Sequence, residues 1–196
     1  MPRKNIILSL AASLLIGLYL IPTLINTGTF NKLPSPFIIL FIVLPIMSFI
    51  GILIAYLIGK KIALFWQLSK FALVGVLNTA IDFGILNFLS GISQVTKGFW
   101  IIPINATSVS IAMVNSFYWN KDWVFGSRKK ASFATFIVIT LIGLGINTGT
   151  VFILTTFVPA LFGLSETLWA NLAKVLATVL SLVWNFSGYK LVVFKK

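Results

Sequence analysis

Long apolar stretches separated by short polar segments run the whole length of the chain. A bilayer core about 30 Å thick needs roughly 20 apolar helical residues to cross it. Six stretches meet that length, at about 5–25, 36–58, 67–90, 100–121, 131–158 and 167–190. None shows the sustained alternation of apolar and polar residues that is typical of a membrane β-strand. The pattern therefore predicts an all-α membrane protein with six transmembrane helices.

Composition narrows the function classes. The chain of 196 residues is 59% hydrophobic and 9% charged, with a mean hydropathy of +1.05, which is too apolar for a soluble domain. It has no cysteine and no histidine, so a disulfide framework and the commonest metal ligands are excluded. Its acidic residues are Asp82, Asp122 and Glu166. Paired-carboxylate hydrolysis is therefore poorly supported, and we expect neither an enzyme nor a cofactor.

The basic residues predict the orientation. If the N-terminus is cytoplasmic, Lys32 and Lys97 fall in outer loops, while twelve other basic residues fall inside. This positive-inside bias places both termini in the cytoplasm and explains the net charge of +12 without nucleic acid. The twelve are Arg3, Lys4, Lys60, Lys61, Lys70, Lys121, Arg128, Lys129, Lys130, Lys190, Lys195 and Lys196.

The first two stretches form a predicted hairpin at 1–62. The first is too long for the apolar region of a signal peptide and is interpreted as a retained helix. The second contains Pro45, a residue that can kink a membrane helix without ending it. A four-helix transmembrane domain at 63–196 is expected to follow.

A shift of 69 residues aligns two parts of that domain, at about 70–125 and 139–194. The Asn-Thr pair at Asn78 then falls on the pair at Asn147, and Lys121 falls on Lys190. Polar residues are rare in so apolar a chain, so their shared register favours a duplication. Each copy holds two spans, and the copies are therefore expected to be parallel repeats related by an axis along the membrane normal.

Two ionisable residues lie well inside the predicted spans, and both break the repeat. Asp82 corresponds to Val151, and Lys174 corresponds to Asn105. At about 1.5 Å per helical residue both lie roughly 10–12 Å below the outer boundary, in one layer. Because a charge in hydrocarbon costs at least a few kcal/mol, we expect the two to pair or to face water. Two interpretations stay open: a substrate site in which Lys174 meets an anionic head group, and a structural salt bridge between the repeats.

Asparagines in the spans are further candidates. They either line a path for a polar substrate or hold helices together by hydrogen bonds. They are Asn78, Asn105, Asn115 and Asn147. A GxxxG pair at Gly145 and Gly149 predicts close helix packing.

Lys121 and Lys190 end the two symmetric helices near the cytoplasmic face. Aromatic residues surround both positions in sequence, which is typical of interfacial anchoring. The other interpretation is an entrance that captures phosphate, because an ammonium group suits phosphate as a point charge.

Three segments resemble the signatures of GtrA-like membrane proteins. The first is KFALVGVLNTAIDF at 70–83, and the second is NSFYWNKDWVF at 115–125. The third is echoed by Trp-Asn-Phe at 184–186, Tyr-Lys at 189–190 and Val-Phe at 193–194. The resemblance covers about 68–196 and leaves the N-terminal hairpin outside.

The resemblance implies a bacterial cytoplasmic-membrane protein that flips a polyprenyl-phosphate-linked monosaccharide, typically undecaprenyl-phosphate glucose, for cell-surface polysaccharide glycosylation. Its implied substrate-binding residues are those that the sequence singles out: Lys174, Asp82, Asn78, Asn105, Asn147, Lys121 and Lys190. The implied partners are the lipid-linked sugar, membrane lipid and a GtrB-type glycosyltransferase, with a homo-oligomer left open. No Walker motif is present, so ATP hydrolysis by that route is not expected.

Two other functions compete with flipping. A small-solute or drug exporter would need an intramembrane acid such as Asp82 for a cationic substrate, and the cation Lys174 in the same predicted layer argues against it. A membrane scaffold for a glycosyltransferase would need none of these residues except for folding.

Overall fold

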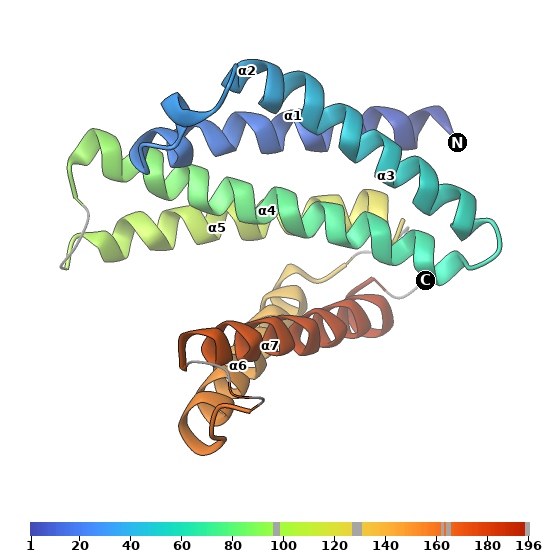
Figure 1. Ribbon diagram of the computed structural model, residues 1–196. Coiled ribbons are helices and arrows are strands. Elements are labelled where there is room, and N and C mark those ends of the chain that lie inside the picture. The colour runs from blue at the N-terminus through green and yellow to red at the C-terminus, as the bar shows by residue number, and fades with distance from the viewer. Residues whose placement is uncertain (96–98, 127–130, 162, 164–165, 195–196) are drawn as a thin grey trace. The chain divides into compact units, whose positions relative to one another are not determined.

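The computed structural model describes residues 1–95, 99–126, 131–161, 163 and 166–194, with backbone alone at 101–102, 148, 151–152, 155, 166–175 and 178. Within this part of the chain every regular element is helical, which confirms the all-α prediction (Figure 1). The elements are α1 (Arg3–Asn26), η1 (Phe30–Lys32), α2 (Pro36–Ile38), η2 (Ile39–Val43), α3 (Leu44–Gly59), α4 (Ala63–Ser93), α5 (Ile101–Trp119), η3 (Asn120–Val124), α6 (Phe133–Phe157), α7 (Glu166–Gly188) and η4 (Tyr189–Val193).

The six apolar ranges predicted as spans coincide with six helical stretches to within a few residues. Among the described residues, three stretches are long and apolar enough on their own to cross a membrane: Arg3–Asn26, Pro36–Gly59 and Ala63–Ser93. Shorter apolar stretches occur at Phe133–Asn147 and Val179–Val193. These lengths support a membrane-embedded helical protein, and the count of six crossings stays a prediction.

The chain divides into two compact units, unit 1 at 1–126 and unit 2 at 127–196, each described here by itself. In unit 1 the long helix α4 packs against α1, α3 and α5. Helix α1 runs parallel to α4, and α5 runs antiparallel to it. Its connection of α1 to the following helices leaves the predicted domain boundary at residue 62 untested.

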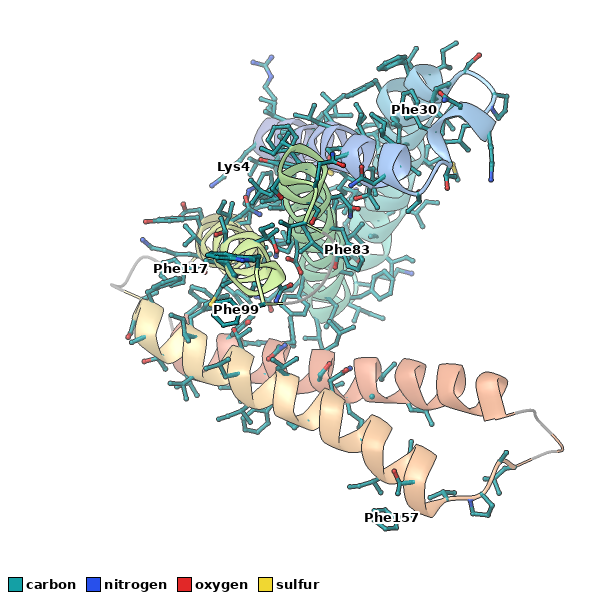
Figure 2. All side chains as sticks on the ribbon, turned by 90° about the vertical axis from the view of Figure 1, so that its left-hand side faces the viewer. Lys4, Phe30, Phe83, Phe99, Phe117 and Phe157 are labelled. Carbon is teal, nitrogen blue, oxygen red and sulfur yellow. The ribbon has the colours of Figure 1, made fainter. Side chains whose placement is uncertain are left out.

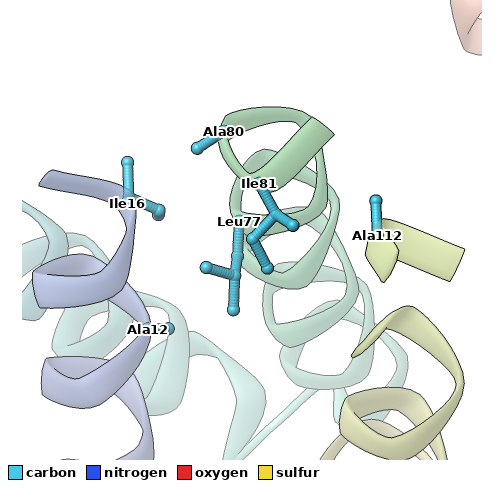
Figure 3. Packing of buried hydrophobic residues seen from close by; sticks show 6 residues of the cluster. All are labelled: Ala12, Ile16, Leu77, Ala80, Ile81 and Ala112. Carbon is cyan, nitrogen blue, oxygen red and sulfur yellow. The ribbon is translucent and has the colours of Figure 1, made fainter. Parts of the chain in front are cut away.

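Small side chains bring the helices of unit 1 together. Ala12 of α1, Ala80 of α4 and Ala112 of α5 are buried in one cluster, which Ile16, Leu77 and Ile81 complete (Figure 3). Gly84 of α4 faces the backbone carbonyl of Tyr19, and a Cβ at that position would overlap it. Between membrane helices such small residues permit the close backbone approach that gives van der Waals attraction. The position of α1 on α4 therefore depends on residues without bulk.

The second predicted span contains a local irregularity. Its first part is the π turn η2, and Pro45 follows at the start of α3, so the helical run continues through the proline as predicted. Proline lacks an N–H and its ring crowds the carbonyl four residues earlier, while a π turn is a common site of helix bending. The perturbation near Pro45 thus takes the form of a widened turn.

Large apolar side chains cover the outer surfaces of the helices. Phe83 and Phe157, which are labelled in Figure 2, are 51% and 69% exposed. Ser9, Ser13 and Ser108 are fully buried. A water-soluble protein shows the opposite distribution, because exposed apolar patches of this extent promote association. The distribution is that of a bundle surrounded by lipid.

Unit 2 consists of α6 packed on α7 and η4. The close approaches occur at Gly143, where a Cβ would overlap the Asn185 side chain, and at Gly188, where it would meet Ile139 at 2.6 Å. The glycines that the sequence singled out, Gly145 and Gly149, have no described atom within 4 Å of such a Cβ. The prediction of close packing at this pair is therefore wrong for contacts within the chain, because the GxxxG pattern does not reveal which face of α6 meets α7.

Two π turns occupy matching positions in the two units. Turn η3 continues α5, and turn η4 continues α7, with their bounds 69 residues apart. The turns close on the bonds Phe125 N–H to Asn120 O at 2.9 Å and Phe194 N–H to Tyr189 O at 2.8 Å. Because π turns are rare, the shared position agrees with the sequence register.

Candidate functional site

Two hydrogen bonds between polar side chains join α4 to α5. The Ser108 hydroxyl donates to Oδ1 of Asp82 at 2.6 Å. One and a half turns away in the direction of the α4 N-terminus, Nδ2 of Asn115 donates to Oδ1 of Asn78 at 2.7 Å. Both pairs are partly buried. They hold the helices together, and their remaining lone pairs and N–H groups provide the polar chemistry inside this apolar unit.

The structure brings Asp82 and Asn78 onto the face of α4 that meets α5, but not Asn105. The side chain of Asn105 is exposed on α5, and its backbone carbonyl accepts from the Ser108 hydroxyl at 2.9 Å. The side chain of Lys174 lies outside the described residues, and Asn147 belongs to unit 2. The pairing of Asp82 with Lys174 therefore stays a prediction.

A buried lysine fastens the start of α4 to the end of η3. Lys70 is 9% exposed, and its Nζ donates to the carbonyls of Trp123 at 2.7 Å and Val124 at 3.1 Å. The ammonium also lies 5.4 Å from the centre of the Trp66 ring. A cation at a helix C-terminus is favourable because unpaired carbonyls there carry partial negative charge. Lys70 thus satisfies the end of the π turn.

Helix α1 adds two contacts at the same place. Nζ of Lys4 donates to the carbonyl of Asp122 at 3.1 Å, and Nε1 of Trp123 donates to Oδ1 of Asn5 at 2.9 Å. Figure 2 labels Lys4 near the beginning of α1. We call this part of unit 1, formed by Lys4, Asn5, Lys70 and η3, the basal end.

Lys121 and Lys190 occupy the second positions of the two π turns. Lys121 is half-buried, whereas Lys190 is exposed with its Nζ 5.6 Å from the centre of the Phe186 ring. A lysine beside an aromatic ring fits interfacial anchoring, and an accessible ammonium can also meet a phosphate. The geometry therefore leaves both sequence interpretations of this pair in place.

At the opposite end of unit 1, α1 and α4 meet through a second polar cluster. Nδ2 of Asn26 donates to the Asn87 carbonyl at 2.7 Å, and Nδ2 of Asn87 lies 3.3 Å from Oγ1 of Thr23. A groove of about 380 Å³ lies over this cluster, with mostly apolar walls that include Pro22 and Phe88. The cluster orients the end of α1 on α4.

Sequence reasoning missed two residues of these contacts. Ser108 is fully buried, and its serine was not distinguishable from others in so apolar a span. Lys70 was assigned only to the basic inner side, although its position at the head of an apolar run signals a lysine whose stem is buried. Among the described residues, no cluster of acidic, histidine or cysteine side chains could hold a metal ion.

Comparisons with known proteins assign the part of the chain that holds these contacts. Residues 70–194 match the family described as GtrA/DPMS, transmembrane domain. The chain is also similar to the uncharacterized membrane protein YngA of Bacillus subtilis (strain 168), with 32% identity over 132 residues, which make up 65% of this chain and 78% of the relative. No solved structure matches. The matched range begins at Lys70 and ends in η4 and its C-cap, so α1 to α3 lie outside it.

Proposed function

The chain belongs to the GtrA/DPMS transmembrane-domain family, and on this premise we propose that it moves a polyprenyl-phosphate-linked monosaccharide across the bacterial cytoplasmic membrane. Undecaprenyl-phosphate glucose is the representative cargo, and cell-surface polysaccharide glycosylation is its use. The observation that carries the proposal is the family match over 70–194, a range that contains both π turns and both polar pairs of α4 and α5.

The polar pairs support this kind of cargo. A sugar and an anionic phosphate cannot enter hydrocarbon without polar partners, because each unpaired polar group there costs several kcal/mol. Asp82, Ser108, Asn78 and Asn115 provide donors and acceptors along one side of α4. In the proposed mechanism the head group moves along polar side chains while the isoprenoid tail stays in lipid. Lys174, inside the last predicted span, offsets the phosphate charge.

The proposed topology has six transmembrane helices with both termini in the cytoplasm. In unit 1 the basic residues Lys4 and Lys70 gather at the basal end, which agrees with a cytoplasmic location for that end. The matching π turns support the proposed duplication, in which the two units are parallel repeats. Synthesis of the cargo on the inside and its consumption outside would drive net movement, with a GtrB-type glycosyltransferase as the proposed inner partner.

The proposal is tested by reconstitution. Purified protein in proteoliposomes is supplied with a short-chain polyprenyl-phosphate glucose, and its transbilayer movement is compared with that in empty vesicles. We expect acceleration by the wild type and a loss of at least tenfold in Lys174→Met, with folding verified by circular dichroism. Lys32→Met, which removes an exposed loop lysine, is the matched control and is expected to retain the wild-type rate.

Two results would contradict the proposal. Folded wild-type protein that moves glucosyl, galactosyl and mannosyl lipids no faster than empty vesicles would overturn translocation. A Lys174→Met protein as active as wild type would remove Lys174 from the proposed path. Loss of a co-reconstituted glycosyltransferase from the membrane without this protein would favour the scaffold instead.

A further inference from the structure

A shallow groove of about 160 Å³ lies at the basal end of unit 1. Its lining residues are Leu8 of α1, Tyr118 and Trp119 of α5, and Asp122 and Trp123 of η3. The π turn places Asp122 and Trp123 here, because the turn closes only at Phe125 and so adds a residue to the last turn of the helix. The groove thus combines three aromatic side chains with a carboxylate.

The orientation of these groups is fixed by contacts on the page. The rings of Trp119 and Trp123 are arranged edge to face, with centroids 5.7 Å apart. Trp123 is 4% exposed, and its Nε1 is bonded to Asn5, so the ring cannot turn freely. Tyr118 is 56% exposed and Asp122 is exposed, so both can reach a ligand. In the described part of the chain the Asp122 carboxylate accepts no hydrogen bond, while its backbone carbonyl accepts from Lys4.

This set of groups suits a hexose. The less polar face of a pyranose presents C–H bonds, which pack on the electron-rich face of an aromatic ring. A carboxylate accepts strong hydrogen bonds from two neighbouring hydroxyls. Lys4 and Lys121 lie in the same part of unit 1, where an ammonium can meet the phosphate attached to the sugar.

Lipid tails fit this groove less well than the groove of about 300 Å³ between α1 and α3. That groove is lined by apolar residues alone, among them Leu10, Phe41 and Phe49. A tail in the basal groove would desolvate the Asp122 carboxylate without giving it a partner, which is costly. The phosphate is also excluded from the position beside Asp122, since like charges repel. The group that meets both the carboxylate and the rings is therefore a neutral, hydroxyl-bearing one.

We propose that the basal groove binds the hexose of the lipid-linked sugar before it crosses the membrane. The inference rests on the proposed function and adds to it the position of the sugar at loading. It also gives a role to α1, which lies outside the range that the family match covers, because Leu8 lines the groove and Asn5 orients Trp123. The N-terminal hairpin thereby becomes part of the binding site.

The test isolates the sugar from the tail and the phosphate. Affinities of the full chain in nanodiscs are measured for polyprenyl phosphate and for its glucosyl, galactosyl and mannosyl derivatives. We expect at least one sugar to raise the affinity of the wild type about tenfold over the bare phosphate. Asp122→Asn and Tyr118→Leu should reduce this ratio to about twofold or less, with the affinity for the bare phosphate unchanged. Trp100→Leu, an exposed aromatic at the other end of α5, is the control and should retain the wild-type ratio.

The two proposals fail in different ways. If the wild type shows no sugar-dependent gain, or if both groove variants retain it, the groove does not bind the sugar and this inference is overturned, whatever the transport rate. If the gain is present and is lost in Asp122→Asn, but wild-type proteoliposomes move no lipid, the groove stands and translocation fails. Because Asp122 and Tyr118 are exposed, folding of both variants is expected to be unchanged.

Discussion

The two π turns share a backbone but are held in place by different chemistry. In unit 1 the end of η3 is fixed by the Lys70 ammonium on two carbonyls. In unit 2 the end of η4 is fixed by aromatic packing, in which Phe136 is stacked on Tyr189 with centroids 4.5 Å apart and lies 6.2 Å from Phe194. At the position that matches Lys70 in the 69-residue register, unit 2 has Ile139. The same turn can thus be secured by a buried cation or by rings.

This difference changes what each end can do. An ammonium and a set of carbonyls remain polar, and in unit 1 they lie beside an aromatic groove with a carboxylate. The corresponding part of unit 2 is closed by side chains of 0% and 2% exposure, Phe136 and Phe194. Unit 1 therefore keeps a chemically competent surface at its turn, whereas the turn of unit 2 is a packed core.

The largest expected effect is on the aromatic side of the comparison. Phe136→Ala removes a fully buried ring that contacts both Tyr189 and Phe194, and we expect it to destabilise unit 2 by about 3 kcal/mol. The measurement is the midpoint of thermal unfolding in detergent. Phe157→Ala, at a 69% exposed position, is the control with little expected change. Equal midpoints for the two variants would show that η4 does not depend on the stack.

On the polar side, Lys70→Met leaves the carbonyls of Trp123 and Val124 without their donor while nearly keeping the side-chain volume. Unpaired buried acceptors cost about 1–3 kcal/mol each, and we expect a total loss of about 2 kcal/mol. The same unfolding assay compares it with Lys60→Met, in which an exposed lysine is lost. A Lys70→Met protein as stable as wild type would mean that water or another donor replaces the ammonium.

A smaller effect separates hydrogen bonding from stacking in unit 2. Tyr189→Phe keeps the ring but removes the hydroxyl that lies 2.6 Å from Oγ1 of Thr140, and about 1 kcal/mol is expected. Thr140→Val should cost a similar amount, and the double variant should cost no more than about either alone, since both remove one bond. Fully additive losses in this cycle would rule out the bond as a source of stability.

The smallest expected effect concerns the hydrogen bond from Asn115 to Asn78. Hydrogen bonds between membrane helices contribute about 0.6 kcal/mol on average, so Asn115→Leu should lower stability by about that amount. If the pair also serves the cargo, translocation should fall by more than the small change in stability explains. Unchanged transport in this variant would assign the pair to helix packing alone.

Much of the fold follows from the chain itself, because helices in lipid are dictated by apolar length. The predicted ranges therefore coincide with the helices to within a few residues. The register between the repeats also placed Phe125 and Phe194 correctly as equivalents, since both close a π turn. What the chain could not reveal is the rotation of each helix about its axis. For that reason Gly145 and Gly149 were chosen where Gly143 makes the contact, and Asn105 was grouped with residues from which the structure separates it.

The candidate site shows the same limit in finer detail. Asp82 was recognisable because a charge inside a span is rare, but its partner Ser108 lies 26 residues away on another helix. Lys70 looked like one more basic residue of the inner side until its stem was seen to be buried. Contacts of this kind depend on pairs of helices, and single residues in one sequence do not specify them.

The paired π turns also bear on the history of the chain. A turn that closes on the fifth residue holds one residue more than a regular helix would, so each turn corresponds to a one-residue insertion. Two independent insertions at positions 69 residues apart would be a coincidence. Under the duplication proposed above, the insertion preceded the doubling, and the ancestral single unit already carried it. The buried lysine and the aromatic stack are then later, divergent answers to one inherited irregularity.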